Sequence, residues 1–164
     1  MSGIGFKLEI SGLDQATARL NAMGSLDFHH LLDGLSRLGA EQTKRRIEVE
    51  HRSPNGFPWV KTYDGRAALF QTGAHLARSI DHAVKGDAAI WGSGWIGARI
   101  HNFGGVIKPV NGNALKFWWV SKGHVAFAVV KSVTMPKRQY LGVSSENAKE
   151  LEATAARFVA KVLQ

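Results

Sequence analysis

The sequence contains no cysteine among its 164 residues. This absence excludes disulfide bonds and thiolate metal sites, so an intracellular setting fits better than a secreted one. Apolar runs are short, and none approaches the roughly 20 residues that a membrane-spanning helix requires. The first ten residues, MSGIGFKLEI, alternate between apolar and polar side chains and predict no signal peptide. We therefore expect one soluble domain over residues 1–164, long enough to bury a core of its own.

Acidic residues are also missing from the stretch between Ala88 and Ser145, which contains no Asp or Glu. We call this stretch the positive block, because its basic residues contribute +7 to the chain's net charge of +8. They are Arg99, Lys108, Lys116, Lys122, Lys131, Lys137 and Arg138. Such a block attracts polyanions or an acidic protein neighbour through its electrostatic field, but it does not determine a fold.

Apolar residues at helical spacing predict helices toward both ends of the chain. The clearest begins after Asp27, a good N-cap residue, and ends near the basic run at 44–46. Two shorter segments, 13–23 and 69–80, also show helical spacing, the second with a Thr-Gly interruption. The apolar stripe of the clearest helix consists of Phe28, Leu31, Leu32, Leu35 and Leu38.

A last helix is predicted to fill the C-terminal part of the chain. Ser144 or Ser145 can cap it, and Glu146 in its first turn suits the positive end of the helix dipole. No Gly or Pro interrupts the pattern after that point. Its apolar stripe consists of Leu151, Ala155, Phe158, Val159 and Val162.

Alternating apolar and polar residues predict one strand near the start of the chain and two hairpins in its middle. The strand covers residues 6–10. The first hairpin joins 80–84 to 88–91 through a glycine turn, and the second joins 115–119 to 125–129. An N-terminal strand and helices, central antiparallel β-hairpins and a long C-terminal helix together predict an α+β fold.

The stretch IGARIHNFGG at 96–105 is predicted to form a packed corner. Ile100 and Phe103 lie three residues apart, which places both on one face of a helical turn, where we expect them to contact the core. His101 and Asn102 are then expected to face elsewhere. The two final glycines end the turn, because glycine takes positive φ at little cost.

Turn residues predict long loops near 51–66 and 106–114. The first contains Trp59 and Tyr63, which are either held against the body or available to a partner. Loops of this composition can be mobile alone and become ordered on assembly, so we expect both to form interfaces.

Candidate chemical motifs do not withstand closer inspection. Gly92 to Gly97 matches G-x-G-x-x-G, but the first acidic residue after it is Glu146, too far away to hold a ribose. His29 and His30 are adjacent and cannot share one helix face, and no H-E-x-x-H cluster exists. The chain also lacks G-x-S-x-G, a Walker loop and a closely spaced carboxylate pair. We expect no cofactor, no metal and no enzymatic activity.

The second predicted hairpin concentrates aromatic residues within the positive block, namely Phe117, Trp118, Trp119 and Phe127. Aromatics beside lysines can bind nucleic acid, where rings stack on bases and cations meet phosphates. The alternative is a structural hairpin with one aromatic face in the core and solvated lysines along its edges. Trp118 lies on the opposite face of the hairpin from Phe117 and Trp119. One of the two faces of the hairpin must therefore be exposed or covered by another subunit.

Five segments, taken in order, carry a resemblance to a known family. They are SPNGFPW at 53–59, LFQTGAHLARSI at 69–80, ARIHNFGG at 98–105, MPKRQYLGVS at 135–144, and the terminal helix. Together they resemble the virion-morphogenesis family of tailed bacteriophages, also described as tail-completion proteins, from Mu-like and P2-like phages. The family's motif positions are occupied here by Pro54, Gly56, Trp59, Leu69, Thr72, Gly73, His101, Phe103, Gly104, Gly105, Pro136, Arg138, Leu141 and Gly142.

The resemblance implies a non-enzymatic structural protein of the virion neck, which completes the tail or joins it to the DNA-filled head within a homo-oligomeric ring. The implied partners are further copies of the chain, neighbouring neck or tail proteins and packaged DNA, with no membrane; the implied location is the virion, and the host cytoplasm during assembly. Candidate contacts to DNA or to an acidic partner are Arg99, Lys108, Lys116, Lys122, Lys131 and Lys137. A basic DNA-binding module or nuclease accessory is the alternative.

Overall fold

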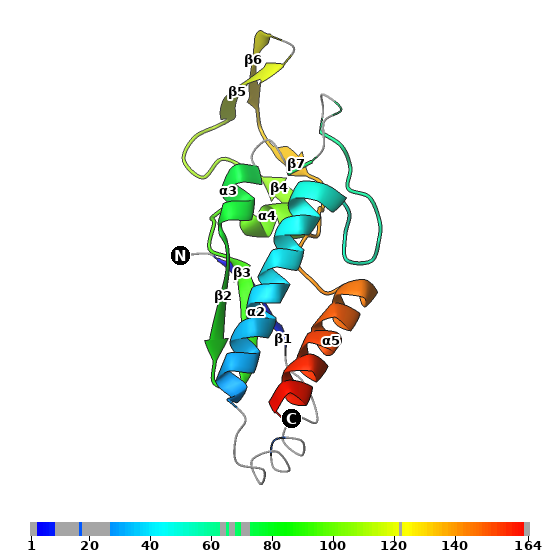
Figure 1. Ribbon diagram of the computed structural model, residues 1–164. Helices are drawn as coiled ribbons and strands as arrows, with labels where there is room; N and C mark the ends of the chain where they lie inside the picture. Colours follow the sequence, from blue (N-terminus) through cyan, green and yellow to red (C-terminus); the bar gives the residue numbers. More distant parts are fainter. Residues whose placement is uncertain are drawn as a thin grey trace.

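The computed structural model describes residues 3–8, 17, 27–62, 65, 68–69, 73–121 and 123–162 (Figure 1). The helix predicted at 13–23 lies outside this part of the chain except for residue 17, and so do Tyr63, Thr72 and Lys122. In the described part, helices precede and follow a central run of antiparallel strands. The predicted α+β fold is confirmed.

The long helix α2 (Phe28–Arg45) begins and continues as its sequence predicts. Oδ1 of Asp27 accepts the backbone N–H of His30 at 3.1 Å, which satisfies one free donor of the first turn. Beyond α2 the chain widens into one π-helical turn, η1 (Arg46–Glu50), and leaves it through His51 in the left-handed conformation. The buried residues of α2 include Leu31, Leu32, Leu35, Gly39 and Ala40.

A three-stranded antiparallel sheet packs against α2 (Figure 1). It consists of β1 (Ile4–Leu8), β2 (Ile80–Lys85) and β3 (Ala88–Ser93), with β3 in the centre. The first predicted hairpin is thus confirmed, while β1 begins two residues earlier than predicted. Trp91 of β3 faces the helix and lies so close to Gly39 that a Cβ there would sit 2.6 Å from the indole ring. Glycine at this position therefore permits the close approach of sheet and helix.

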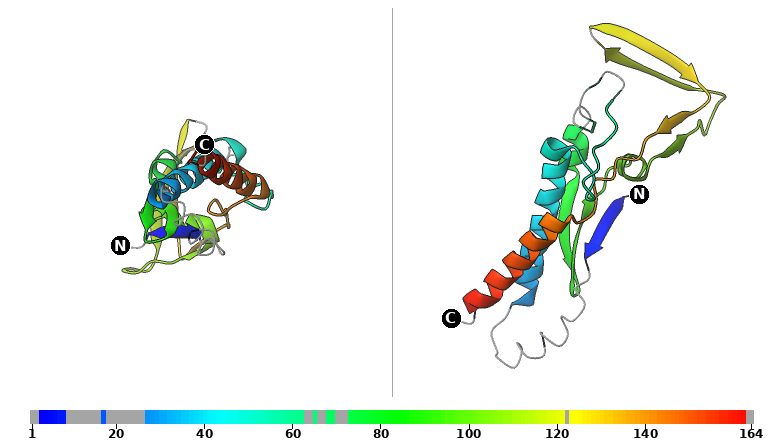
Figure 2. Two further views of the ribbon diagram at one scale, coloured as in Figure 1. Left: turned by 60° about the horizontal axis from the view of Figure 1, so that its bottom comes forward. Right: turned by 90° about the vertical axis from the view of Figure 1, so that its right-hand side faces the viewer.

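The C-terminal helix α5 (Ser145–Val162) lies beside α2 (Figure 2). Ser144 is its cap, because the Ser144 Oγ accepts the backbone N–H of Asn147 at 3.1 Å. Leu151 is buried between the two helices, and Phe158 packs against the same cluster. The predicted cap and stripe are confirmed at these positions.

One predicted helix and one predicted loop are shorter than expected, and the other predicted loop keeps its irregular structure among the described residues. The helical segment of 69–80 is reduced to α3 (Gly73–Arg78) among the described residues, because Ile80 already belongs to β2. The loop predicted at 106–114 is wrong in its first two residues, since β4 (Gly105–Ile107) pairs with β7 (Val133–Met135). In the described part of 51–66, the only ladder contact is an isolated bridge between Arg52 and Pro58.

The second predicted hairpin is confirmed as β5 (Leu115–Ser121) and β6 (His124–Val130), a two-stranded antiparallel sheet. It projects beyond β4 and β7, away from α2, α5 and the three-stranded sheet (Figures 1 and 2). We call β5 and β6 the arm. The remaining described elements together are called the body.

Candidate functional site

The corner at 96–105 contains the short helix α4 (Ala98–Phe103), which ends at Gly104. The φ angles of Gly104 and Gly105 are 71° and 147°, so the predicted positive φ is confirmed at both. A Cβ on Gly104 would lie 2.7 Å from the backbone nitrogen of Lys137 and 2.9 Å from the carbonyl oxygen of Met135. This glycine is therefore required by its conformation and by the close passage of another segment.

The predicted orientation of the corner is wrong. Phe103 is 56% exposed, whereas Asn102 is only 2% exposed. Ile100 is intermediate, and His101 stacks on Trp95 with ring centroids 5.4 Å apart. A buried amide has replaced the expected aromatic contact because Asn102 binds a segment nearly forty residues away.

That segment, residues 136–142, is contacted by several elements, and we call it the hub segment. Oδ1 of Asn102 accepts the backbone N–H groups of Tyr140 and Leu141 at 3.1 and 3.0 Å. The Tyr140 hydroxyl donates to the carbonyl oxygen of Ala98 at 3.1 Å, and the backbone N–H of Arg138 donates to the carbonyl oxygen of His101 at 3.0 Å. Four hydrogen bonds, all donated by the hub segment and accepted by α4, therefore fix the helix to this segment.

The loop after η1 reaches the hub segment from another side. Trp59 is 7% exposed, and its indole Nε1 donates to the carbonyl oxygen of Gln139 at 3.1 Å. Arg138 is equally buried, and its Nε donates to the carbonyl oxygen of Val60 at 3.0 Å. Of the two interpretations of Trp59, the structure supports the one in which this side chain is held against the body.

Arg46 connects η1 with the hub segment from the interior. It is 1% exposed, and its Nη1 donates to the carbonyl oxygens of Tyr140 and Gly142 at 2.8 and 2.9 Å. Its Nη2 donates to Oδ1 of Asn147, in the first turn of α5. One guanidinium therefore joins η1, the hub segment and α5 through three neutral acceptors, a geometry that suits the planar fork of arginine.

Burial changes the ionisation of three groups around the hub segment. It lowers the pKa of the Arg46 guanidinium, an effect that the charge of Glu50 partly opposes. Burial also lowers the pKa of Arg138. For His101, burial is the main cause of a lowered pKa and the positive charge of Arg138 adds to it. The site therefore favours a neutral imidazole at position 101.

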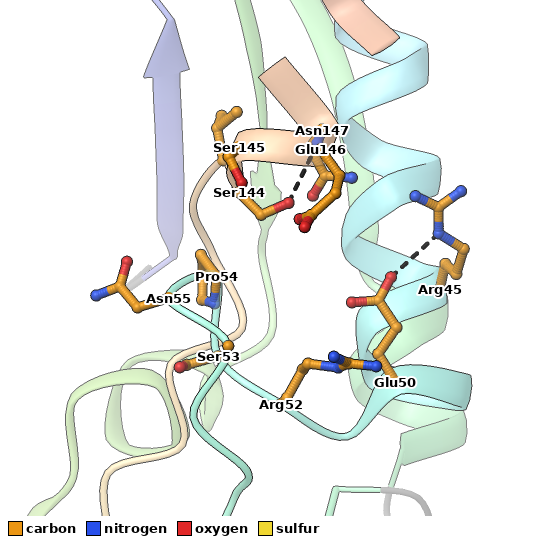
Figure 3. Close-up of a pocket in the computed structure, with 12 residues that line it drawn as sticks. Arg45, Glu50, Arg52, Ser53, Pro54, Asn55, Ser144, Ser145, Glu146 and Asn147 are labelled. Carbon is orange, nitrogen blue, oxygen red and sulfur yellow. Dashed lines mark hydrogen bonds and ion pairs between the residues drawn. The ribbon is translucent and has the colours of Figure 1, made fainter. Parts of the chain in front are cut away.

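An open pocket of about 910 Å³ lies beside the hub segment, between the loop after η1 and the first turn of α5 (Figure 3). Arg45 and Glu50 form an ion pair on its wall, with 3.1 Å between Nε and Oε1. Arg52 and Glu146 add one charge of each sign. Because these charges offset each other, the pocket has no strong preference for an anion or a cation.

Several residues at the family's motif positions are buried, pass close to another segment or take a special backbone conformation. A Cβ on Gly142, whose φ is 139°, would lie 2.8 Å from Cγ of Pro54, so these two residues pass closely. Leu69 is 5% exposed, Gly73 begins α3, and Gly56 takes a positive φ in the loop after η1. Pro136 follows β7 directly, and Leu141 is buried in the larger core cluster.

The candidate contacts to DNA or to an acidic partner are not brought together at one point. Arg99, Lys108, Lys116, Lys131 and Lys137 are exposed, in that order on α4, in the chain after β4, on the arm, directly after the arm and in the hub segment. Lys122 lies outside the described residues. Arg138 is buried, so not all seven basic residues of the positive block contribute to the surface.

Sequence reasoning missed three residues whose hydrogen bonds hold the hub segment in place: Arg46 and Asn102, which contact it, and Tyr140, which is part of it. One indication of this role was present in the sequence, namely the chemistry of the side chains. Arginine, asparagine and tyrosine can each form hydrogen bonds with backbone groups that are buried away from water. In the described part of the chain no group of three or more His, Cys, Asp or Glu side chains is placed to hold a metal. No helix within the described ranges has the length and apolarity needed to cross a bilayer.

The fold and the hub segment thus define a body with non-local polar contacts in its interior and a projecting arm. Comparison with protein families extends this result. The model of the phage virion morphogenesis family matches residues 8–160, and the chain therefore belongs to that family. Its role is structural, in the assembly of the phage particle. Comparisons with curated proteins and with solved structures gave no match.

Proposed function

We propose that the chain is a structural protein of the phage neck, where it completes the tail or joins it to the DNA-filled head as part of a ring of identical subunits. One observation carries the proposal: the arm is apolar, exposed and free of carboxylates, and it projects from a body that is fixed by the hub segment. An exposed apolar surface of this kind is typical of a protein that functions in an assembly. Membership of the virion morphogenesis family supports an assembly inside the phage particle.

The positive block adds an electrostatic component to this role. Subunits arranged around an axis repeat every exposed charge, so that the lysines of the arm and of the adjacent loop form a band. Such a band attracts DNA phosphates in a central channel or the acidic surface of a neighbouring ring. Both attractions weaken with salt, because the Debye length falls from about 10 Å at 0.1 M to about 3 Å at 1 M.

The experiment is the joining of DNA-filled heads to tails in extracts of a phage that lacks a functional copy of this chain. Purified protein is added back at a series of salt concentrations. The test variant replaces Lys108, Lys116, Lys122 and Lys131 with Gln, and the control variant makes the same change at Lys44, Lys61, Lys149 and Lys161, outside the block. The control should join heads to tails as the unchanged protein does.

The variant of the positive block should join heads to tails less efficiently at low salt and should lose most of the salt response. Restored joining by the unchanged protein supports the neck role itself. If the unchanged protein has no effect on free heads and free tails, the neck role is wrong. If joining by the block variant is normal and equally salt-dependent, the block is ordinary solvated surface.

A DNA-binding module remains the second candidate, and one observation favours it. Trp118 and Phe127 are 70% and 64% exposed beside lysines, an arrangement that suits stacking on unpaired bases. A DNA module should bind single-stranded or duplex DNA as a free monomer, with affinity that falls steeply as salt rises. Weak binding by the monomer together with strong binding by an assembled ring supports the neck role instead.

A further inference from the structure

The arm cannot owe its stability to the body. None of its residues belongs to either buried core cluster of the described chain, and its two strands pair with each other alone. An isolated two-stranded hairpin is marginally stable in water, because it buries too little apolar surface. A surface outside the subunit therefore has to cover it.

One face of the arm is the more exposed. The pairs Trp118–Phe127 and Val120–Val125 lie directly opposite each other across the two strands, so their side chains share a face with the pair Lys116–Val129. The exposed fractions on this face are 70% for Trp118, 64% for Phe127, 52% for Val120, 72% for Val125 and 52% for Val129. We call it the aromatic arm face. A contiguous patch of this size on a water-exposed ribbon marks an interaction site.

The body offers an apolar surface on the side of the sheet that faces away from α2. There the row Gly5–Gly92–Asp81 runs across the three strands, and Ala83 and Ile90 lie in the next row. Glycine and alanine leave an apolar depression of about 290 Å³ between the strands. We call it the sheet hollow. The surface over Gly5 is open, since an added Cβ there would have no atom nearer than 3.9 Å, whereas the space over Gly92 is taken by the backbone of Ile4 and Gly5.

Charged residues favour one orientation of the arm on the sheet hollow. Lys116 lies on the aromatic arm face, and the arm has no carboxylate of its own. The Asp81 side chain is 91% exposed at the sheet hollow. Lys7 lies in the same row as Ile90 and Ala83, and Lys85 lies further along the same face of the sheet; both charges disfavour the reverse orientation of the arm.

The arm cannot reach the hollow of its own subunit. It projects past β4 and β7, whereas the three-stranded sheet runs along α2 in the opposite direction (Figures 1 and 2). We propose that the aromatic arm face of one copy binds in the sheet hollow of the next copy, with Lys116 of the arm against Asp81 of the hollow. The two surfaces differ, so the contact is head-to-tail and closes into a ring when the rotation permits. This inference rests on the proposed function in one respect, since both require self-association.

The first experiment separates the two halves of the contact. The arm variant is Trp118→Glu with Phe127→Glu, the hollow variant is Ala83→Arg, and the control is Val49→Glu, an apolar residue of η1 that is 70% exposed outside both surfaces. Molar mass is measured by sedimentation, and folding by circular dichroism. The unchanged protein and the control should assemble, and the arm and hollow variants should each associate at least about tenfold more weakly.

Mixing the two defective variants gives the sharper result. The arm variant keeps an intact hollow and the hollow variant keeps an intact arm, so an equimolar mixture should form heterodimers that stop at two subunits. A mixture that stays monomeric overturns the proposal, as does full assembly of either variant alone. Should the arm variant not fold, Lys116→Asp and Asp81→Lys replace it: each change alone should weaken assembly and the two together should restore it. A double variant no better than the single ones overturns the proposal.

These experiments distinguish failure of the proposed arm contact from failure of the proposed neck role. If the unchanged protein assembles and restores joining of heads to tails while the arm variant does both equally well, the arm contact is wrong and the neck role stands. If the unchanged protein is monomeric and the arm variant loses DNA binding, the arm is a nucleic-acid surface and the inference is overturned.

Discussion

Oδ1 of Asn102 lies 3.1 Å from the backbone nitrogen of Tyr140 and accepts its hydrogen bond in a region closed to water. The Tyr140 hydroxyl also donates to the carbonyl oxygen of Ala98, so Tyr140 is joined to α4 through both its backbone and its side chain. This pair fixes the base from which β4 and β7 lead to the arm. The chain on either side of the arm thus leads back to two segments that polar contacts join inside the body.

Replacing Asn102 with Ala should destabilise the fold by about 2–4 kcal/mol, because two buried N–H groups lose their acceptor. Chemical denaturation measures the change in the free energy of unfolding. The matched control is Asn113→Ala, an exposed amide, which should change that free energy by less than about 0.5 kcal/mol. Equal effects of the two changes would show that the Asn102 amide has no special role.

Replacing Gly104 with Ala should cost about 1 kcal/mol or more. The new Cβ must enter a backbone conformation with φ of 71° and must also meet the backbone of Lys137. Gly112→Ala is the control, because Gly112 also has a positive φ but has no atom within 4 Å of an added Cβ. A thermal midpoint that falls no further for Gly104→Ala than for Gly112→Ala would remove the close backbone approach from the explanation.

Arg46 and Arg45 are adjacent arginines in different surroundings. Arg46→Lys should lower the free energy of unfolding by about 2 kcal/mol or more, since an ammonium cannot reproduce the fork that holds Tyr140, Gly142 and Asn147. Arg45→Lys keeps an exposed ion pair with Glu50 and should cost less than about 0.5 kcal/mol. Urea denaturation of both variants tests the difference, and similar losses would contradict the assigned role of Arg46.

His101 should make the fold sensitive to mild acid. Its folded-state pKa lies below the ordinary value of 6.5, mainly because burial disfavours the imidazolium and also because Arg138 is close. The unfolded chain therefore binds the proton first, and stability should fall as pH decreases below about 6.5 toward the folded-state pKa. His101→Gln should flatten this part of the stability profile relative to the unchanged protein. His29→Gln, an exposed control, should leave it unaltered, and the same slope in all three proteins would exclude His101.

The elements that the sequence predicted well are those whose pattern repeats over several turns or pairs. The stripe of α2 supplies repeated contacts at helical spacing, and large apolar residues recur at every second position in both strands of the second hairpin, at 115, 117 and 119 and at 125, 127 and 129. Corner 96–105 lacks such a repeat. Its helix has six residues, so Phe103 and Asn102 could not be assigned to inside and outside by spacing alone.

The hub segment was beyond sequence reasoning for a different reason. Arg46 is the last residue of a basic run that is typical of a solvated helix end, yet its acceptors lie 94 to 101 residues further along the chain. Burial of such a cation depends on the meeting of distant segments, which no local pattern describes. Trp59 is a milder case, because its residue type indicated a contact but not that the partner would be the carbonyl oxygen of Gln139.

The measurement that tests the neck role most directly is a reconstruction of the head–tail junction by electron cryomicroscopy of complete phage particles. The account predicts a ring of identical subunits at that junction, into whose density the body fits as described, with each arm over the three-stranded sheet of the adjacent subunit. Absence of the chain from the junction, or its presence in the capsid or at the distal end of the tail, would contradict the account.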